Sequence, residues 1–168
     1  MKMKQLLLIR HGKSEWGNAH LDDADRPLNP RGHRDAPEMA SRLLQKGLSP
    51  QAMVSSPALR ALTTARHFEQ VWFPSADVIK INPSIYEANV STLLEVVNGL
   101  SNDYEKIALF GHNPGFTDFA NYLSNANIYN VPTCGVVLLE FQADDWAEVS
   151  SGTGTLIDFD YPKSPDED

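Results

Sequence analysis

Apolar runs of strand length alternate along the chain with longer segments that carry helix-capping residues. Five such runs are expected to form strands: Gln5–Ile9, Ala52–Ser55, Val78–Ile81, Ile107–Gly111 and Val136–Phe141. The first, fourth and fifth are apolar at nearly every position, which is typical of strands buried on both faces. This alternation predicts an α/β, three-layer sandwich with a mostly parallel central sheet and helices on both faces.

Proline and asparagine punctuate the segments between these runs. Asn29-Pro30 predicts an N-cap followed by the first residue of a helix, and Gly47 predicts its end. Pro37 lies inside this segment and predicts a kink or a delayed start. Three further helices are expected, from Ser56-Pro57 to about Gln70, at Thr92–Leu100, and from Asn113-Pro114 to about Leu123.

The last part of the chain has a different pattern. Val136–Phe141 is followed by two more apparent strands, Trp146–Ser151 and Thr155–Phe159, joined by turns. These strands predict an antiparallel edge on the sheet. Residues 1–160 are therefore expected to form a single domain, and the acidic, proline-rich residues 161–168 a mobile tail.

Composition and charge narrow the possible functions. The chain has 168 residues, of which 42% are hydrophobic, which suits one globular domain with a sizeable core. A net charge of −8 argues against nucleic acid as a partner. The charge is uneven, because all the arginines lie between Arg10 and Arg66. This distribution favours an anion site built from the N-terminal half.

The expected location follows from what the sequence lacks. Cys134 is the single cysteine, so no intrachain disulfide can form, which fits a reducing compartment. The apolar run near the N-terminus is too short for a secretory signal, and nothing approaches the length of a membrane span. We expect a cytoplasmic protein without membrane contact.

Charged side chains follow four of the predicted strands at the point where each strand ends. Arg10 and His11 follow the first strand, Arg60 the second, Glu87 the third and His112 the fourth. In an open α/β sheet, ligands bind beyond the carboxyl ends of the strands. A single histidine or arginine at such a position is more often structural, but five together favour a binding or catalytic site.

Several motifs resemble those of the histidine phosphatase superfamily, also called the phosphoglycerate mutase-like family. Arg10-His11-Gly12 resembles the signature of that family, and three further motifs follow in family order: Ser55-Ser56-Pro57-x-x-Arg60, Ile85-Tyr86-Glu87 and Gly111-His112-Asn113. The segment Asp25-Arg26-Pro27-Leu28-Asn29-x-Arg31-Gly32 is similar to the small SixA branch, whose type activity is protein phosphohistidine phosphatase.

The resemblance implies a covalent mechanism. His11 would be the nucleophile and form a phosphohistidine that water then hydrolyses, with a backbone carbonyl such as that of Gly12 fixing its other ring nitrogen. Arg10, Arg60 and His112 would bind the phosphoryl oxygens. Ser14 could donate a further hydrogen bond to them. No metal or other cofactor would be required.

Glu87 has two interpretations. As a general acid it would protonate an alkoxide leaving group, which a phosphoramidate such as phosphohistidine needs less. Alternatively, it is a carboxylate in a surface loop.

Other polar residues are expected to have structural roles. Asn113 is expected to cap the helix that follows it, and Asp22, Asp23 and Asp25 to form a solvated loop in which Asp25 pairs with Arg26. The arginines other than Arg10 and Arg60 are expected on helix surfaces, away from phosphate. His33 and His67 are expected to be surface or packing residues.

Three functions remain open from the sequence. The first is a SixA-like phosphohistidine phosphatase acting on a phosphorylated protein, for example a histidine-phosphotransfer domain. The second is a broader phosphomonoesterase for small esters or for phosphoserine and phosphothreonine. The third is a non-catalytic module that binds phosphate or a phosphoprotein. The few residues between Glu87 and the next helix predict an open site without a lid, which favours the first function over a mutase.

Overall fold

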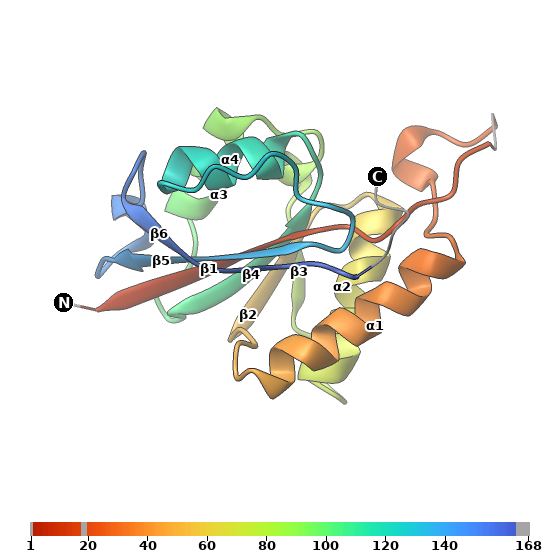
Figure 1. Ribbon diagram of the computed structural model, residues 1–168, viewed down its shortest axis with the longest axis horizontal. Helices are drawn as coiled ribbons and strands as arrows, with labels where there is room; N and C mark the ends of the chain where they lie inside the picture. The colour runs from red at the N-terminus through yellow and green to blue at the C-terminus, as the bar shows by residue number, and fades with distance from the viewer. Residues whose placement is uncertain (1, 18–19, 164–168) are drawn as a thin grey trace.

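A computed structural model describes residues 2–17 and 20–163 of the chain (Figure 1). Six strands form one sheet in the order β3-β2-β4-β1-β5-β6. Their bounds are β1 Met3–Arg10, β2 Ala52–Ser55, β3 Ile79–Ile81, β4 Lys106–Gly111, β5 Val136–Gln142 and β6 Gly154–Asp160. The first four strands in this order run parallel, and β5 pairs antiparallel with both β1 and β6. The predicted sheet with an antiparallel edge is confirmed.

Four helices cover the two faces of this sheet (Figure 1). Helices α1 (Pro30–Gln45) and α2 (Leu59–Trp72) pack on one face, and α3 (Val90–Asn98) and α4 (Gly115–Leu123) on the other. Alternate residues of β1 enter two separate hydrophobic cores. Leu6 and Leu8 belong to the core under α3 and α4, whereas Leu7 and Ile9 belong to the core under α1 and α2. Burial on both faces explains why β1 is apolar at consecutive positions.

The first helix begins where its capping residues predict. The side chain of Asn29 accepts a hydrogen bond of 2.9 Å from the backbone N–H of Gly32, and the helix starts at Pro30. Of the two alternatives predicted from Pro37, a kink or a delayed start, the delayed start is wrong, because α1 runs from Pro30 through Pro37 to Gln45. The second helix starts at Leu59, later than predicted from Ser56-Pro57, because Ser56 Oγ accepts a hydrogen bond from Ala58 N–H ahead of the helix.

The strand predicted at Trp146–Ser151 is wrong. Residues Trp146–Glu148 form a short 3-10 helix, which Asp145 caps by accepting a hydrogen bond from Ala147 N–H. Trp146 and Val149 are both buried in the core under α3 and α4. Their spacing of three residues fits one face of a tight helical turn, whereas a strand would place them on opposite faces.

The parallel strands bring their carboxyl ends to one edge of the sheet, at the right of Figure 1. Arg10 at the end of β1 is in register with Gly111 at the end of β4, and Ser55 at the end of β2 is in register with Phe110 of β4. The segments that follow these strands therefore meet. Of the tail predicted to be mobile, residues 164–168 lie outside the described part of the chain.

Candidate active site

His11 follows β1 directly and is held by its backbone. Its N–H donates to the carbonyl of Gly111 at 3.1 Å, and its carbonyl accepts from the N–H of Cys134 at 2.9 Å. The ring nitrogen Nδ1 lies 2.7 Å from the carbonyl oxygen of Gly12. A carbonyl can only accept, so Nδ1 carries the proton and Nε2 keeps its lone pair. The sequence predicted this arrangement of the ring.

Burial lowers the pKa of His11 to about 3. The hydrogen bond to Gly12 opposes this effect, while the neighbouring His112, Arg10 and Arg60 add to it. The imidazole is therefore uncharged at neutral pH, which leaves the lone pair on Nε2 available for attack on an electrophile.

Close backbone packing fixes the loop after His11. The N–H of Gly12 donates to Thr64 Oγ1 on α2 at 2.9 Å. A Cβ placed on Gly32 of α1 would lie 2.3 Å from the carbonyl oxygen of Lys13. Only glycine permits such a close approach of α1 to the loop. The contacts of Thr64 on α2 and of Gly32 on α1 together position the loop that carries the carbonyl of Gly12.

A pocket of about 310 Å³ lies at this edge of the sheet. It is lined by Arg10, His11, Lys13, Ser14, Trp16, Arg26, Arg60, His112, Asn113 and Thr133. The structure thus brings together five of the six predicted site residues. Glu87 lines a neighbouring cavity of about 550 Å³, which also contains His112 and Asn113. It lies beside the pocket of His11 and does not line it.

His112 lies against His11, with 5.4 Å between the ring centroids. Its Nε2 is 2.7 Å from Ser56 Oγ. Burial lowers the pKa of His112 to about 4, helped by the positive charges of Arg60 and Arg10 and opposed by Asp23. The free protein therefore holds His112 uncharged at neutral pH, so that it can bind a phosphoryl oxygen as a neutral N–H donor and not as a cation.

Sequence reasoning missed the role of Asp23, which lies in a 3-10 turn (η1, Asp23–Asp25). Arg60 donates from Nη1 to the carbonyl oxygen of Asp23 at 2.7 Å and from Nη2 to Oδ2 at 2.9 Å. The hydroxyl of Tyr86 donates to the same Oδ2. The hydrogen bond from Tyr86 and the contact with Arg60 lower the pKa of Asp23 to about 2. The Asp23 side chain is 48% exposed, in line with the predicted solvated loop, but it also binds Arg60 of the pocket, which the sequence did not predict.

Arg26 is the second residue that sequence reasoning missed. Its Nη1 donates to Ser14 Oγ at 2.9 Å, and its Nε donates to Oδ1 of Asp23 at 3.2 Å. The guanidinium carbon lies 3.8 Å from the ring centroid of Trp16, a cation–π contact. The prediction that all arginines outside Arg10 and Arg60 lie away from the pocket is therefore wrong. The acidic partner of Arg26 is Asp23, where the sequence predicted Asp25. The Asp25–Gly32 motif that resembles the SixA branch was the available signal.

Two other polar predictions can be checked. The N-cap position of α4 is Pro114 and not Asn113 as predicted, but Asn113 Oδ1 still accepts from the N–H of Thr117 in the first turn at 3.2 Å, and Asn113 also lines the pocket. His33 and His67 lie outside the pocket and contact each other, with 3.0 Å between Nδ1 and Nε2.

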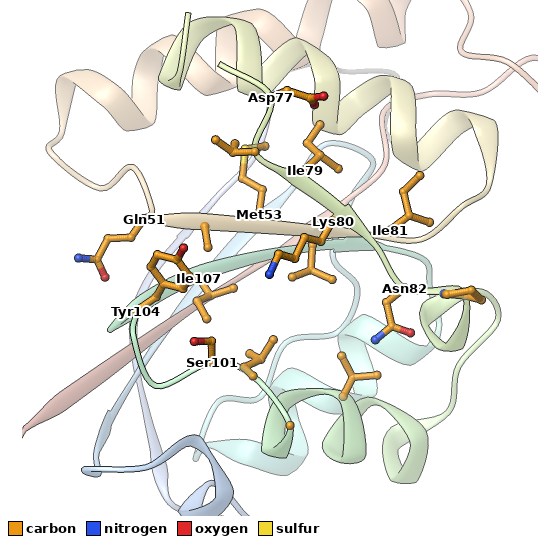
Figure 2. Close-up of a pocket in the computed structure, with 17 residues that line it drawn as sticks. Gln51, Met53, Asp77, Ile79, Lys80, Ile81, Asn82, Ser101, Tyr104 and Ile107 are labelled. Atoms are coloured by element: carbon orange, nitrogen blue, oxygen red, sulfur yellow. The ribbon is translucent and has the colours of Figure 1, made fainter. Parts of the chain in front are cut away.

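A wider cavity of about 680 Å³ lies elsewhere, between β2, β3 and the end of α3 (Figure 2). Its lining includes Met53, Ile79, Ile107 and Tyr104 together with Lys80 and Asp77, and contains no arginine or histidine. Within residues 2–17 and 20–163, no three His, Cys, Asp or Glu side chains are arranged to hold a metal ion. Among the described helices, none combines the length and apolar character needed to cross a bilayer.

The chain is similar in sequence to a known family of proteins. The model of the histidine phosphatase superfamily (branch 1) matches residues 6–93. An uncharacterized chloroplastic protein from Arabidopsis thaliana is 34% identical over 160 residues, which cover 90% of this chain and 72% of the relative.

Two solved structures have the same fold. A SixA protein from Agrobacterium tumefaciens superposes with a TM-score of 0.79 at 24% identity, over 95% of this chain and 98% of that chain. The protein histidine phosphatase SixA in complex with tungstate gives a TM-score of 0.76 at 20% identity, over 94% and 96% of the two chains. The predicted phosphoglycerate mutase-like fold is confirmed.

Proposed function

The chain belongs to the histidine phosphatase superfamily, and from this premise we propose that it is a phosphatase that removes the phosphoryl group from phosphohistidine in a protein. His11 would act as the nucleophile. The observation that carries the proposal is the hydrogen bond from His11 Nδ1 to the carbonyl of Gly12, which leaves Nε2 as the free lone pair in a pocket that also holds Arg10, Arg60 and His112.

The proposed reaction has two steps. In the first, Nε2 of His11 attacks phosphorus, an N–P bond forms, and the bond from phosphorus to the leaving nitrogen breaks, that nitrogen then taking a proton. In the second, water attacks phosphorus, the N–P bond breaks, and its electron pair returns to Nε2 while water gives up a proton and inorganic phosphate leaves. Both steps place negative charge on the same three phosphoryl oxygens.

Planar cationic donors suit those oxygens. Arg10 and Arg60 each present several N–H groups in a fixed fork that matches a phosphoryl group. Arg26 brings a third guanidinium into the pocket. Because the pocket is concave and partly withdrawn from water, these charges act more strongly on the transition state than they would at an open surface.

A protein substrate fits the surroundings of the pocket. Two residues, Ala88 and Asn89, separate Glu87 from the start of α3, so no long insertion is present between them. The SixA structure that shares this fold is described as a protein histidine phosphatase. Glu87, which lies in the cavity beside His112, favours a second candidate, a phosphomonoesterase that protonates an alkoxide leaving group.

The decisive experiment compares purified wild-type protein with His11→Asn and with His33→Asn, a histidine outside the pocket. The substrates are a histidine-phosphotransfer domain labelled on histidine, a phosphoserine peptide and p-nitrophenyl phosphate. We expect the His11 variant to lose activity by at least about 1000-fold and to form no base-stable phosphoenzyme, while the His33 variant keeps both. Hydrolysis that survives in His11→Asn would refute the covalent mechanism. Faster turnover of phosphoserine than of phosphohistidine would favour the second candidate, and binding without turnover the non-catalytic module.

A further inference from the structure

Ser56 contacts a ring nitrogen of His112 from inside the protein. It lies between β2 and α2, is fully buried, and its backbone N–H donates to the carbonyl of Phe110 at 3.0 Å. Its hydroxyl oxygen has two neighbours: the N–H of Ala58 at 3.2 Å, which donates to it, and Nε2 of His112 at 2.7 Å. The short second contact joins the two motifs that contain Arg60 and His112.

The position of the protons follows from counting donors and acceptors. A serine hydroxyl has one proton to donate and two lone pairs. Ala58 N–H uses one lone pair, and Nε2 of His112 is close enough to accept the proton. When Ser56 donates to Nε2, the uncharged imidazole carries its own proton on Nδ1. The reverse arrangement, with Nε2 donating to Ser56, would leave the hydroxyl proton of a fully buried serine without an acceptor, which is costly.

The other ring nitrogen of His112 is in an unusual position. Nδ1 is buried and has no hydrogen-bond partner among the described residues. His112 nevertheless lines the pocket that contains His11, Arg10 and Arg60. Buried polar atoms without partners are rare and call for an explanation such as a missing ligand atom. A phosphoryl oxygen is an acceptor and would supply that partner.

We propose that Ser56 is a positioning residue which holds His112 in the Nδ1–H tautomer and so makes it an N–H donor to a phosphoryl oxygen. This inference rests on the proposed function, because it assigns the acceptor to the phosphoryl group of the substrate. In the opposite tautomer, a lone pair on Nδ1 would face an anion and repel it. Ser56 therefore acts on the substrate through His112 without touching it.

The charges around His112 do not replace this role. His11 and Tyr86 pack against its ring, each with 5.4 Å between ring centroids. Arg60, Arg10 and Arg26 disfavour a charged His112, and Asp23 favours it. Burial together with the three arginines keeps the ring uncharged, but none of these arginines forms a hydrogen bond with either ring nitrogen. The contact with Ser56 therefore determines which of the two uncharged tautomers of His112 forms.

The first test is direct observation of the tautomer. Long-range ¹H–¹⁵N correlation spectra of ¹⁵N-histidine-labelled wild-type protein near pH 7 are expected to show His112 protonated at Nδ1. In Ser56→Ala the Nε2–H form should appear or dominate, and Ser56→Thr should restore the wild-type pattern. A matched control is Ser55→Ala, because Ser55 is equally buried but donates to the carbonyl of Ser56 instead of to His112. Wild-type protein with the proton on Nε2 would overturn the inference, and so would an unchanged tautomer in Ser56→Ala.

The second test measures the consequence with inorganic phosphate as the probe. A hydrogen bond to a charged acceptor is worth about 10- to 100-fold in binding, so Ser56→Ala should weaken phosphate binding by about that factor while Ser55→Ala leaves it unchanged. Unchanged phosphate binding in Ser56→Ala would refute the role of His112 as an N–H donor oriented by Ser56. Neither readout requires turnover, so a protein that shows both effects but hydrolyses no phosphohistidine would contradict the proposed function alone. If Ser56→Ala fails to fold, the wild-type tautomer and the Ser56→Thr variant still decide the question.

Discussion

Asp23 and Arg60, 37 residues apart in the sequence, form a two-point contact in which Asp23 Oδ2 lies 2.9 Å from Arg60 Nη2. The backbone carbonyl oxygen of Asp23 accepts a second hydrogen bond, of 2.7 Å, from Nη1 of the same guanidinium. The carboxylate and the backbone carbonyl of one residue thus each occupy a donor of an arginine that we assign to phosphate binding. Asp23 both orients Arg60 and places a negative charge beside the proposed position of a phosphoryl dianion.

Removal of this charge should strengthen phosphate binding. Asp23→Asn keeps the carbonyl contact with Arg60 but removes the repulsion between two negative groups. Because the Asp23 side chain is 48% exposed, the dielectric is close to that of water, and the repulsion at a few ångströms then corresponds to about 3- to 10-fold. We expect the inhibition constant of inorganic phosphate to fall by that factor. Asp25→Asn is the control, because Asp25 lies in the same turn, whereas the hydrogen bonds of Arg60 go to Asp23. Weaker phosphate inhibition in Asp23→Asn would mean that the orienting contact outweighs the repulsion.

The role of Glu87 should depend on the leaving group. If the protein acts on phosphohistidine, Glu87→Gln should change kcat/KM for that substrate by less than about 3-fold, because imidazole leaves without strong acid assistance. A phosphoserine substrate should lose about 100-fold or more, since general acid catalysis contributes at least that much for a poor leaving group. Glu95→Gln, on the exposed side of α3, is the control. A large loss with phosphohistidine would contradict the proposed mechanism.

The sheet and most of the site could be predicted because their signals are local. A parallel strand buried on both faces appears as an apolar run, and β1, β4 and β5 all do so. The site residues at the strand ends follow from topology, because the carboxyl ends of parallel strands share an edge.

The wrong predictions have tertiary causes. Nothing local to Asp23 shows that its turn lies against Arg60 of α2, so sequence reasoning left it in a solvated loop. The same packing of the turn against α2 brings Arg26 into the pocket, where Trp16 and Ser14 contact it. Trp146 was placed in a strand because apolar residues recur there, but its burial against the core selects a 3-10 turn instead. Long-range packing decided each of these cases.

Arg26 should contribute to substrate affinity. Arg26→Ala removes a guanidinium from the pocket together with its contacts to Ser14 and Asp23, and hydrogen bonds that involve charged groups are worth about 1.5–3 kcal/mol. We therefore expect kcat/KM to fall by about 10- to 100-fold. Arg34→Ala removes an arginine whose side chain is 65% exposed on α1 and should leave kcat/KM unchanged. Equal effects of the two variants would show that Arg26 contributes through net charge alone.

The histidines of the pocket should make the fold sensitive to mild acid. The pKa of His11 is about 3 and that of His112 about 4 in the folded protein, against 6.5 for an ordinary histidine. Between pH 6.5 and 4 the unfolded chain therefore binds more protons, and the free energy of unfolding falls as the pH is lowered. From pH 6.5 to pH 5 each of the two histidines should lower the free energy of unfolding by about 2 kcal/mol.

Urea denaturation of wild-type protein and His11→Asn at pH 7 and pH 5 measures this effect. Between pH 7 and pH 5 the free energy of unfolding of His11→Asn should fall by about 2 kcal/mol less than that of the wild type, because the variant lacks one of the two histidines. Asp23 does not interfere, since its pKa lies near 2 when folded and 3.8 otherwise, below this window. Equal losses in the two proteins would contradict the lowered pKa of His11.

Gly32 should be intolerant of even one additional carbon. Helix propensity alone would make Gly32→Ala stabilising by about 1 kcal/mol within α1. The added Cβ, however, would lie 2.3 Å from the carbonyl oxygen and 3.1 Å from the nitrogen of Lys13, and backbone atoms cannot rotate aside. The loop must shift, at a cost of about 1–3 kcal/mol in the free energy of unfolding. The shift also moves the neighbouring carbonyl of Gly12, which orients His11.

Whether Gly32→Ala raises or lowers the free energy of unfolding therefore tests the packing of Gly32 against Lys13. Gly32→Ala should be less stable to urea than the wild type, and its kcat should fall by about 10-fold or more, since a small misplacement of catalytic groups has effects of this size. Gly99→Ala is the control, because its Cβ would meet Glu95 O at an ordinary 3.6 Å and should change stability by less than about 0.5 kcal/mol. A Gly32→Ala protein that is more stable and fully active would show that α1 does not position the loop of His11.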